Sequence, residues 1–302
     1  MISKPVLSIC IPTNNRVEIM RETLHSIFKQ RVNTDLFEVC ISDNSKTDET
    51  RLLIEKEFND IPNLVYNKSD CEGFLNSMEA LKLGQGQLLK LHNDYSKFNL
   101  GALMRMIRIV ETYKNTDSVI FFSMGNIRTN GIIEKENFND FLNNISYWST
   151  WSSAFAIWKT DFEQLLNTNI QVDHMFPHTT LLFNLTNKKK YIVDDRKYVT
   201  NIELKKKGGY NLIDNFVRIY LSMVNDLLQR KCIKINTYNK IEKAIIKFSA
   251  EWLNKVRFNS KYTFTFENRK TLITNQCGNE GWLLFKMYSW YYYFKYLIKS
   301  IL

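Results

Sequence analysis

Short apolar runs recur along the first 125 residues, and polar positions separate them. A strand that is buried on both faces is expected to be a continuous apolar run, because neither face needs polar side chains. The pattern therefore predicts five strands, at residues 6–12, 37–43, 63–67, 87–92 and 118–123.

Longer segments with helical periodicity lie between these runs. Residues 16–30 place Met20, Leu24 and Ile27 on one helical face. Residues 45–48 form a capping box that opens a second helix. Further helices are predicted at residues 74–84 and 100–114. This alternation predicts an α/β fold with a mostly parallel sheet and right-handed crossovers.

Polar clusters follow four of the predicted strands, at residues 13–16, 43–45, 68–70 and 92–94. In a parallel sheet, ligands bind at the carboxyl ends of the strands. Any one cluster is typical of a helix cap, but four at one sheet edge favour a binding site.

The pattern changes after residue 145. Residues 147–162 are aromatic and strand-like, Pro177 suits the first turn of a helix, and residues 189–199 form another strand. Residues 203–211 contain three lysines and two glycines, which predicts a mobile loop.

Helical periodicity dominates the last third of the chain, at residues 214–231 and 240–256. We place a domain boundary near Gly208. The prediction is therefore an α/β domain at residues 1–207 and a helical C-terminal region at residues 208–302.

The tail at residues 282–302 is apolar enough to raise the question of a membrane. Lys286, Lys295 and Lys299 interrupt it, and each lysine buried in a bilayer costs roughly 2.5–3.5 kcal/mol. A spanning helix is therefore not expected. Two alternatives remain open: an aromatic helix at the bilayer interface, or a helix packed on the α/β domain.

Composition narrows the partners and the location. The net charge of +10 favours anionic partners, but the sequence contains no nucleic-acid recognition module. Five scattered cysteines without a C-x-x-C motif are typical of free thiols in a reducing compartment. The N-terminal apolar run is too short for a signal peptide. We expect a cytoplasmic protein, peripheral on the inner face of the cytoplasmic membrane.

Three stretches resemble a known family: LSICIPTNNRVEIMRETLHSIFKQ, FEVCISDNSKTDET and CEGFLNSMEALKLGQGQLLKLHNDY. They resemble the opening strand and helix, the second strand, and the run into the metal-binding strand end of the family 2 glycosyltransferases. The resemblance covers residues 5–125 and, more loosely, residues 145–200. It implies a Rossmann-like GT-A fold that binds a nucleotide sugar.

The resemblance assigns roles to residues at the strand ends. Asp43 is expected to accept a hydrogen bond from the nucleobase ring, and Arg16 is expected to reach a phosphate. The donor is expected to be a UDP-, dTDP- or similar nucleotide sugar. Its predicted contacts are Pro12, Thr13, Asn15, Arg16, Asp43, Ser45, Asn76 and Asn93.

Where the family has an aspartate-rich motif, this sequence has His92, Asn93 and Asp94. One carboxylate can still hold Mg²⁺ or Mn²⁺, because such ions keep water ligands and take others from substrate phosphates. We expect Asp94 to be the chief ligand of a divalent metal, with His92 as a ligand for Mn²⁺.

An inverting transferase needs a base that takes the proton of the acceptor hydroxyl. The family usually supplies it from an acidic pair at a helix start, where this chain reads QVDHMFPHTTLLF. Asp173 lies slightly before that position and His178 lies at it. A helix N-terminus disfavours a protonated histidine, so His178 would stay neutral. The competing role of Asp173 is that of a loop or capping acid. The competing role of His178 is that of a first-turn residue bonded to backbone.

The leading functional prediction is a glycosyltransferase of bacterial O-antigen or capsule synthesis, acting on a glycan or a polyprenyl-pyrophosphate-linked acceptor. The depleted acid motif suggests an alternative, a non-catalytic subunit that binds a nucleotide sugar or glycan. A sugar-1-phosphate nucleotidyltransferase is disfavoured, because PTNNR lacks that class's glycine-rich signature.

Overall fold

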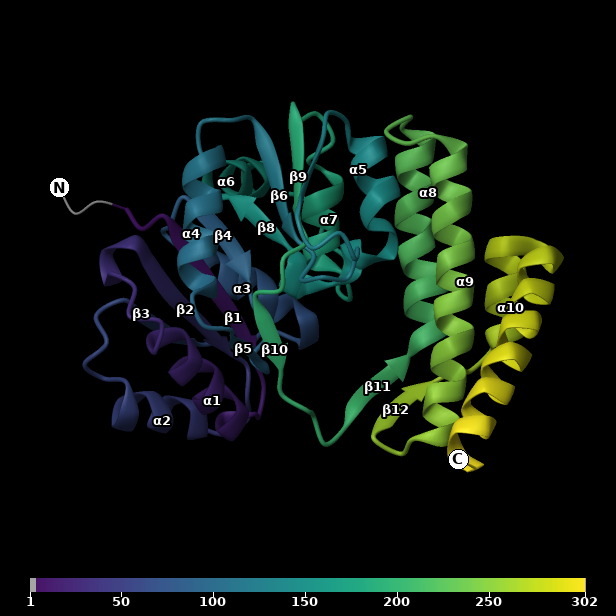
Figure 1. Cartoon of the computed structure of the whole chain (residues 1–302), viewed down its shortest axis with the longest axis horizontal. Coiled ribbons are helices and arrows are strands. Elements are labelled where there is room, and N and C mark those ends of the chain that lie inside the picture. Colours follow the sequence, from purple (N-terminus) through teal and green to yellow (C-terminus); the bar gives the residue numbers. More distant parts are fainter. Residues whose placement is uncertain (1–3, 302) are drawn as a thin grey trace. The chain divides into compact units, whose positions relative to one another are not determined.

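The computed structural model describes residues 4–301. The chain splits after Glu203 into two compact units, which we describe separately as the N-terminal unit and the C-terminal unit (Figure 1). The boundary expected near Gly208 falls within a strand of the second unit, β11 (Lys207–Asn211).

A five-stranded sheet forms the centre of the N-terminal unit, in the order β3-β2-β1-β4-β8. Its strands are β1 (Leu7–Thr13), β2 (Phe37–Asp43), β3 (Leu64–Lys68), β4 (Leu88–Leu91) and β8 (Ala156–Trp158). The first four are parallel, and β8 runs antiparallel to β4. Thr13 pairs with Asp43, so the carboxyl ends of β1 and β2 are level.

Four helices follow strands of the first half: α1 (Val17–Phe28), α2 (Glu49–Glu57), α3 (Asn76–Leu83) and α4 (Ala102–Tyr113). Helix α1 buries Met20, Leu24 and Ile27, the face that the helical period predicts. Strand β1 lies between β2 and β4, and this central position explains its continuous apolar run.

A second sheet completes the N-terminal unit, in the order β6-β9-β7. Its strands are β6 (Ser118–Phe122), β7 (Ile132–Lys135) and β9 (Lys190–Asp194); β5 (Ser96–Phe98) pairs with β10 (Val199–Asn201). The remaining helices are α5 (Phe138–Ile145), α6 (Lys159–Asn167) and α7 (Pro177–Phe183). The predicted α/β class, with a mostly parallel central sheet flanked by helices, is confirmed.

Two predictions about local structure in this unit are wrong. Residues 147–162 form two 3₁₀ turns (Ser146–Thr150 and Ser152–Ala154), the short strand β8 and the start of α6, so only three of them are in a strand. Ser45 does not cap a helix: α2 begins four residues later, and the Ser45 hydroxyl donates to the Asp43 carboxylate.

The C-terminal unit is helical. It contains a π-helix (Asp214–Tyr220), α8 (Leu221–Gln229), α9 (Ile235–Phe258), α10 (Arg269–Ile301) and the strand β12 (Tyr262–Thr265). Helix α9 packs against both α8 and α10 (Figure 1). Helix α10 is interrupted at Gly278, where φ is 69°. Among the described residues, no helix is long and apolar enough to cross a membrane.

The lysine- and glycine-rich stretch of residues 203–211, predicted as a loop, contains β11, which runs parallel to β12. Gly208 permits this pairing with a φ of 139°, and a Cβ there would lie 2.6 Å from the backbone nitrogen of Phe264. The predicted tail belongs to α10, which buries Phe285 and Tyr292. Its last residue, Leu302, lies outside the described residues.

Candidate functional site

The carboxyl ends of β1 and β4 meet at Asp94. Its Oδ2 accepts a hydrogen bond from Thr13 Oγ1 at 2.8 Å, and its Oδ1 accepts one from Arg16 Nη1 at 2.9 Å. The Asp94 backbone carbonyl accepts a third from Thr23 Oγ1 of α1, at 2.7 Å. The loop after β1 therefore holds an acid that lies far away in the sequence.

The Arg16–Asp94 ion pair joins a buried acid to a half-exposed base. Asp94 is 2% exposed, whereas the Arg16 side chain is 39% exposed and lies over the Tyr95 ring at 5.6 Å. Burial raises the pKa of the Asp94 carboxyl, and Arg16 and Thr13 offset part of that rise. Because a guanidinium has five N–H donors, Arg16 keeps donors for an anion while it holds Asp94.

Asp43, at the end of β2, is wholly buried. Its Oδ1 accepts hydrogen bonds from the Ser45 backbone N–H at 2.9 Å and from the Ser45 hydroxyl. Its Oδ2 accepts one from the Tyr66 hydroxyl at 3.0 Å and lies 3.6 Å from Lys68 Nζ. Burial and the Asp43 charge raise the pKa of Tyr66. In this arrangement Asp43 orders its neighbours and leaves no oxygen at the surface.

Asn76 joins the ends of β1 and β2 from the first turn of α3. Its Nδ2 donates to the backbone carbonyls of Ser42 at 2.8 Å and Thr13 at 3.2 Å, and its Oδ1 accepts from Ser42 Oγ at 2.7 Å. Pro12 lies directly opposite Ser42 in the paired strands. Asn76 and Pro12, both predicted to contact the nucleotide-sugar donor, therefore support the sheet edge on which the site is built.

Asn15 adopts the left-handed region, with φ of 52°. Its backbone N–H donates to Ser45 Oγ at 2.6 Å, and its side chain accepts from the Lys46 backbone N–H at 3.3 Å. The loops after β1 and β2 are thus tied together. Thr13, Asn15, Arg16, Asp43 and Ser45 form one connected cluster, as the topological rule for strand ends predicts.

His92 does not join this cluster. Its Nε2 lies 2.6 Å from the Ser96 carbonyl and its ring stacks on Phe98 at 4.8 Å between centroids. Burial, and next the charge of Lys90, lower its pKa to about 3. Asn93 faces a different neighbour: its Oδ1 accepts from Ser152 Oγ at 3.2 Å.

The predicted metal ligands differ in how well they fit a cation. Within residues 4–301, no group of three or more His, Cys, Asp or Glu side chains is arranged to hold a metal ion. Asp94 fits a hard cation by its chemistry, although both its oxygens now bind protein groups. In His92, Nε2 is bonded to the Ser96 carbonyl and the ring stacks on Phe98, whereas Nδ1 is buried and has no hydrogen-bond partner among the described residues.

Asp173 and His178 lie on either side of the start of α7. Asp173 Oδ1 accepts hydrogen bonds from the backbone N–H groups of Met175 and Phe176, both at 2.8 Å, so it caps the turn that leads into the helix. His178 is buried, and its Nε2 lies 3.0 Å from the Thr150 carbonyl. Burial lowers the pKa of His178 to about 4, so it is neutral as predicted, but for a different reason.

Sequence reasoning missed Tyr66 and the wholly buried Lys90. Lys90 Nζ donates to the carbonyls of Leu91 and Ser153, each at 2.9 Å, which ties β4 to the 3₁₀ turn Ser152–Ala154. Burial lowers its pKa to about 7. The signal for Lys90 was a lysine inside the apolar run LLKL; Tyr66 gave none, because tyrosine is common in strands.

Comparisons with known proteins agree with this geometry. Residues 8–88 match the family model Glycosyl transferase family 2. A 51-residue stretch is 49% identical to the abequosyltransferase RfbV of Salmonella typhimurium. That stretch is 17% of this chain and 15% of the relative, so most of the relative's length is not matched.

Solved glycosyltransferase structures share the fold over most of the chain. S. aureus TarS 1-349, in complex with UDP-GlcNAc, has a TM-score of 0.57 and 17% identity over 95% of this chain and 79% of that one. The mannosyltransferase PcManGT from Pyrobaculum calidifontis, in complex with GDP-Man and Mn²⁺, has a TM-score of 0.51 and 13% identity over 95% and 87%. The predicted GT-A fold is confirmed.

Proposed function

We propose, from the match of residues 8–88 to the glycosyl transferase family 2 model, that this chain transfers a sugar from a nucleotide-sugar donor to a glycan or lipid-linked acceptor. The reaction would serve a bacterial surface polysaccharide of the O-antigen or capsule type. The abequosyltransferase relative and the neighbours bound to UDP-GlcNAc and GDP-Man support this reading.

One observation carries the proposal: the Thr13–Arg16–Asp94 cluster adjoins Asp43 at the carboxyl edge of a parallel sheet. A nucleoside diphosphate needs a cation for its phosphates and polar groups for its base. Arg16 supplies the cation for the phosphates, because its half-exposed guanidinium has donors that face solvent. The sheet edge near Asp43 and Ser45 supplies the polar groups for the base.

Calorimetry with UDP-, dTDP- and GDP-sugars tests this proposal. One donor class should bind, and Arg16→Gln should weaken it roughly tenfold or more, because a charge-assisted bond to phosphate is lost. Arg21→Gln is the matched control, since Arg21 lies on α1, which begins directly after Arg16, and pairs with Glu57 instead of Asp94. If no nucleotide sugar binds the intact chain, the proposal is wrong.

The chemistry assigned to the protein is deprotonation of the acceptor. As the acceptor oxygen attacks the anomeric carbon, its proton passes to a base, the sugar–phosphate bond breaks and the nucleoside diphosphate leaves. We propose Asp173 as that base ahead of His178, because the imidazole is buried and bonded to Thr150. Inversion at the anomeric carbon would follow from this single displacement.

A pair of substitutions separates the two roles of Asp173. Asp173→Asn keeps the oxygen that accepts from the backbone N–H groups of Met175 and Phe176 but cannot take a proton, so kcat should fall about 10²- to 10⁴-fold with little change in melting temperature. Asp173→Ala should also lose about 1 kcal/mol of stability with the cap. Unchanged kcat in Asp173→Asn would move the role of base to another residue.

A divalent cation, Mn²⁺ or Mg²⁺, is part of the proposal, and Asp94 would hold it. The ion would neutralise the charge of the donor diphosphate, taking its remaining ligands from phosphate and water. Support comes from the Mn²⁺ in the mannosyltransferase neighbour. Asp94 would bind it with the carboxylate oxygen that now accepts from Arg16.

A non-catalytic nucleotide-sugar-binding subunit is the second candidate. The observation that favours it is the single acid of the motif, which is already paired with Arg16. The two candidates differ in turnover: a transferase slowly hydrolyses its donor without an acceptor, and a binding subunit does not. Donor hydrolysis followed by release of the nucleoside diphosphate therefore distinguishes them.

We place this reaction at the inner face of the cytoplasmic membrane. A lipid-linked acceptor stays in the bilayer, whereas the nucleotide sugar comes from the cytosol. A peripheral attachment would bring the two substrates together.

A further inference from the structure

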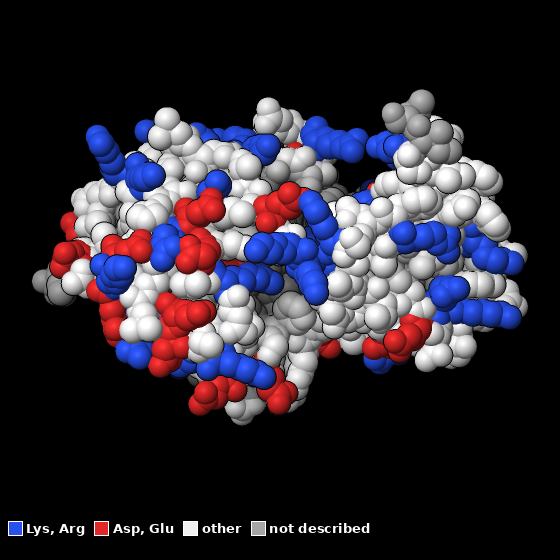
Figure 2. Space-filling view, turned by 90° about the horizontal axis from the view of Figure 1, so that it is seen from below, with Lys and Arg blue, Asp and Glu red and all other residues white. Residues whose placement is uncertain are grey.

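The net positive charge of this chain comes entirely from the C-terminal unit. Residues 204–302 contain 18 Lys and Arg against 6 Asp and Glu, a net charge of +12, whereas residues 1–203 contain 23 against 25. In Figure 2, blue side chains on the C-terminal unit rise from a mostly white surface, and red gathers on the N-terminal unit. A net charge of +12 on about a hundred residues favours binding to an anionic partner.

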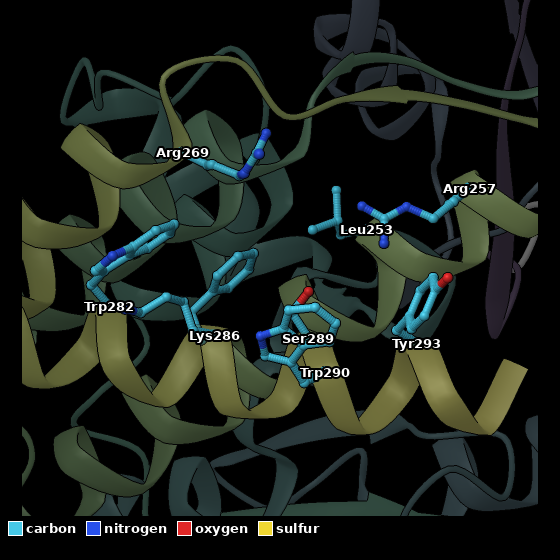
Figure 3. A pocket seen from close by; sticks show the side chains of 9 residues that line it. Leu253, Arg257, Arg269, Trp282, Lys286, Ser289, Trp290 and Tyr293 are labelled. Atoms are coloured by element: carbon cyan, nitrogen blue, oxygen red, sulfur yellow. The ribbon is translucent and has the colours of Figure 1, made fainter. Parts of the chain in front are cut away.

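A pocket of about 210 Å³ lies between α9 and α10. Arg257, Arg269 and Lys286 line it together with Trp282, Trp290 and Tyr293 (Figure 3). Arg257 lies over the Tyr293 ring at 5.4 Å, and Lys286 over the Trp282 ring at 5.9 Å. Within residues 4–301, none of the three cations forms an ion pair with a carboxylate. The pocket thus has three uncompensated positive charges and an aromatic wall.

An exposed apolar stripe runs along α10 beside this pocket. Six large side chains are each 54–61% exposed and, apart from the neighbours Trp290 and Tyr291, recur at intervals of three or four residues: Leu283, Met287, Trp290, Tyr291, Phe294 and Ile298. Residues at this spacing share one helical face. The opposite face, with Phe285 and Tyr292, is buried. The stripe is therefore a second apolar surface on a helix whose core-facing side is already satisfied.

Lysines flank the stripe on both sides. At about 100° per residue, Lys286 falls beyond one border, and Lys295 and Lys299 fall beyond the other. Glu280 is the only acid in residues 279–302. An apolar stripe with exposed Trp and Tyr, bordered by lysines, is the pattern of a helix that lies in the plane of a bilayer interface.

We propose that the pocket and the stripe together form a docking surface for a bilayer that contains anionic phospholipids. The stripe enters the acyl boundary, and Arg257, Arg269 and Lys286 bind lipid phosphates. A second copy of the chain is the less favoured occupant, because it would bring the same unpaired cations to the contact. The role of this surface rests on the proposed function, but binding to lipid does not require glycosyl transfer.

Co-sedimentation with vesicles tests the docking surface. The intact chain should bind vesicles of phosphatidylcholine with about a third phosphatidylglycerol and should bind pure phosphatidylcholine at least tenfold more weakly. The triple variant Arg257→Gln, Arg269→Gln, Lys286→Gln should lose at least tenfold in binding. The control Lys205→Gln, Lys206→Gln, Lys231→Gln removes the same charge outside the pocket and should lose less than about threefold. Equal losses in the two triples would overturn the pocket assignment.

The stripe is tested separately with Met287→Ser and Phe294→Ser, which change exposed side chains and leave the buried face intact. This variant should bind acidic vesicles at least tenfold more weakly with an unchanged melting temperature. Brominated lipids should quench the tryptophan fluorescence of the intact chain more than that of Trp290→Phe, since Trp290 lies on the stripe.

Three results would overturn the proposal: no binding of the intact chain to acidic vesicles, unchanged binding in the stripe variant, or a stripe-dependent dimer that binds no vesicles. These measurements use neither donor nor acceptor. A chain that binds vesicles but no nucleotide sugar would therefore contradict the proposed function and still support the docking surface.

Discussion

At the scale of single residues, Asp94 has two competing partners, the Arg16 guanidinium and a cation. In the cation-bound state, the Asp94 oxygen that now accepts from Arg16 would bind the metal. Mn²⁺ should therefore strengthen donor binding in the wild type, and Asp94→Asn should lose that gain, roughly ten- to hundredfold. Arg16→Gln frees the Oδ1 of Asp94, so the Mn²⁺ affinity of this variant should rise. Calorimetry with Mn²⁺ or with a chelator measures both effects.

A chelator that leaves wild-type donor affinity unchanged would remove the metal from the proposal. Arg16 would then carry the diphosphate alone, and Arg16→Gln would abolish donor binding under all conditions. The same variant pair thus decides which positive charge the donor uses.

Asp43 poses a second question at this scale, because it is wholly buried beneath Ser45 and Tyr66. Asp43→Ala should raise the donor Kd about ten- to hundredfold, whether the acid contacts the base or acts through Tyr66. Tyr66→Phe distinguishes the routes. It removes the hydrogen bond to the Asp43 Oδ2, so donor affinity should hold or improve if Asp43 contacts the base. A loss equal to that of Asp43→Ala would show that Asp43 positions Tyr66 instead.

At the scale of elements, Lys90 joins β4 to the 3₁₀ turn at residues 152–154. Burial lowers its pKa from 10.5 to about 7, so between these values the unfolded chain binds more protons than the folded one. The free energy of unfolding should then rise with pH from about 7 to 10, by up to about 1.4 kcal/mol per unit. Urea denaturation at pH 7 and pH 9 should show this rise in the wild type and not in Lys90→Met.

Lys82→Met is the control for this measurement, because Lys82 is exposed on α3 and pairs with Glu79. It should keep the wild-type pH dependence. If Lys90→Met keeps it as well, the Lys90 ammonium is not desolvated in the way its burial indicates.

At the scale of the whole molecule, the sequence predicts what is periodic and local. The run FEVCISD matches β2 residue for residue, and the rule for strand ends collects Thr13, Arg16, Asp43 and Asp94 at one edge. The sequence does not predict which side chains from distant segments contact each other, such as Arg16 and Asp94. Aromatic content misled at residues 147–162, because Trp and Tyr suit strands but pack equally well from 3₁₀ turns.

The division of charge between the two units leads to the last prediction. Removing the tail cannot test attachment, because Phe285 and Tyr292 are part of the core, and truncation would destabilise the C-terminal unit.

Salt tests the attachment to acidic vesicles without a mutation. Screening shortens from about 10 Å at 0.1 M to about 3 Å at 1 M, so binding of the +12 unit to acidic vesicles should fall at least tenfold. Donor affinity should change by less than about threefold, because the N-terminal unit has a net charge near zero and its Arg16–Asp94 pair is half buried. Co-sedimentation and calorimetry in the same buffers measure the two responses. If both fall together, one electrostatic surface serves donor and membrane alike, and the assignment of a separate role to each unit is wrong.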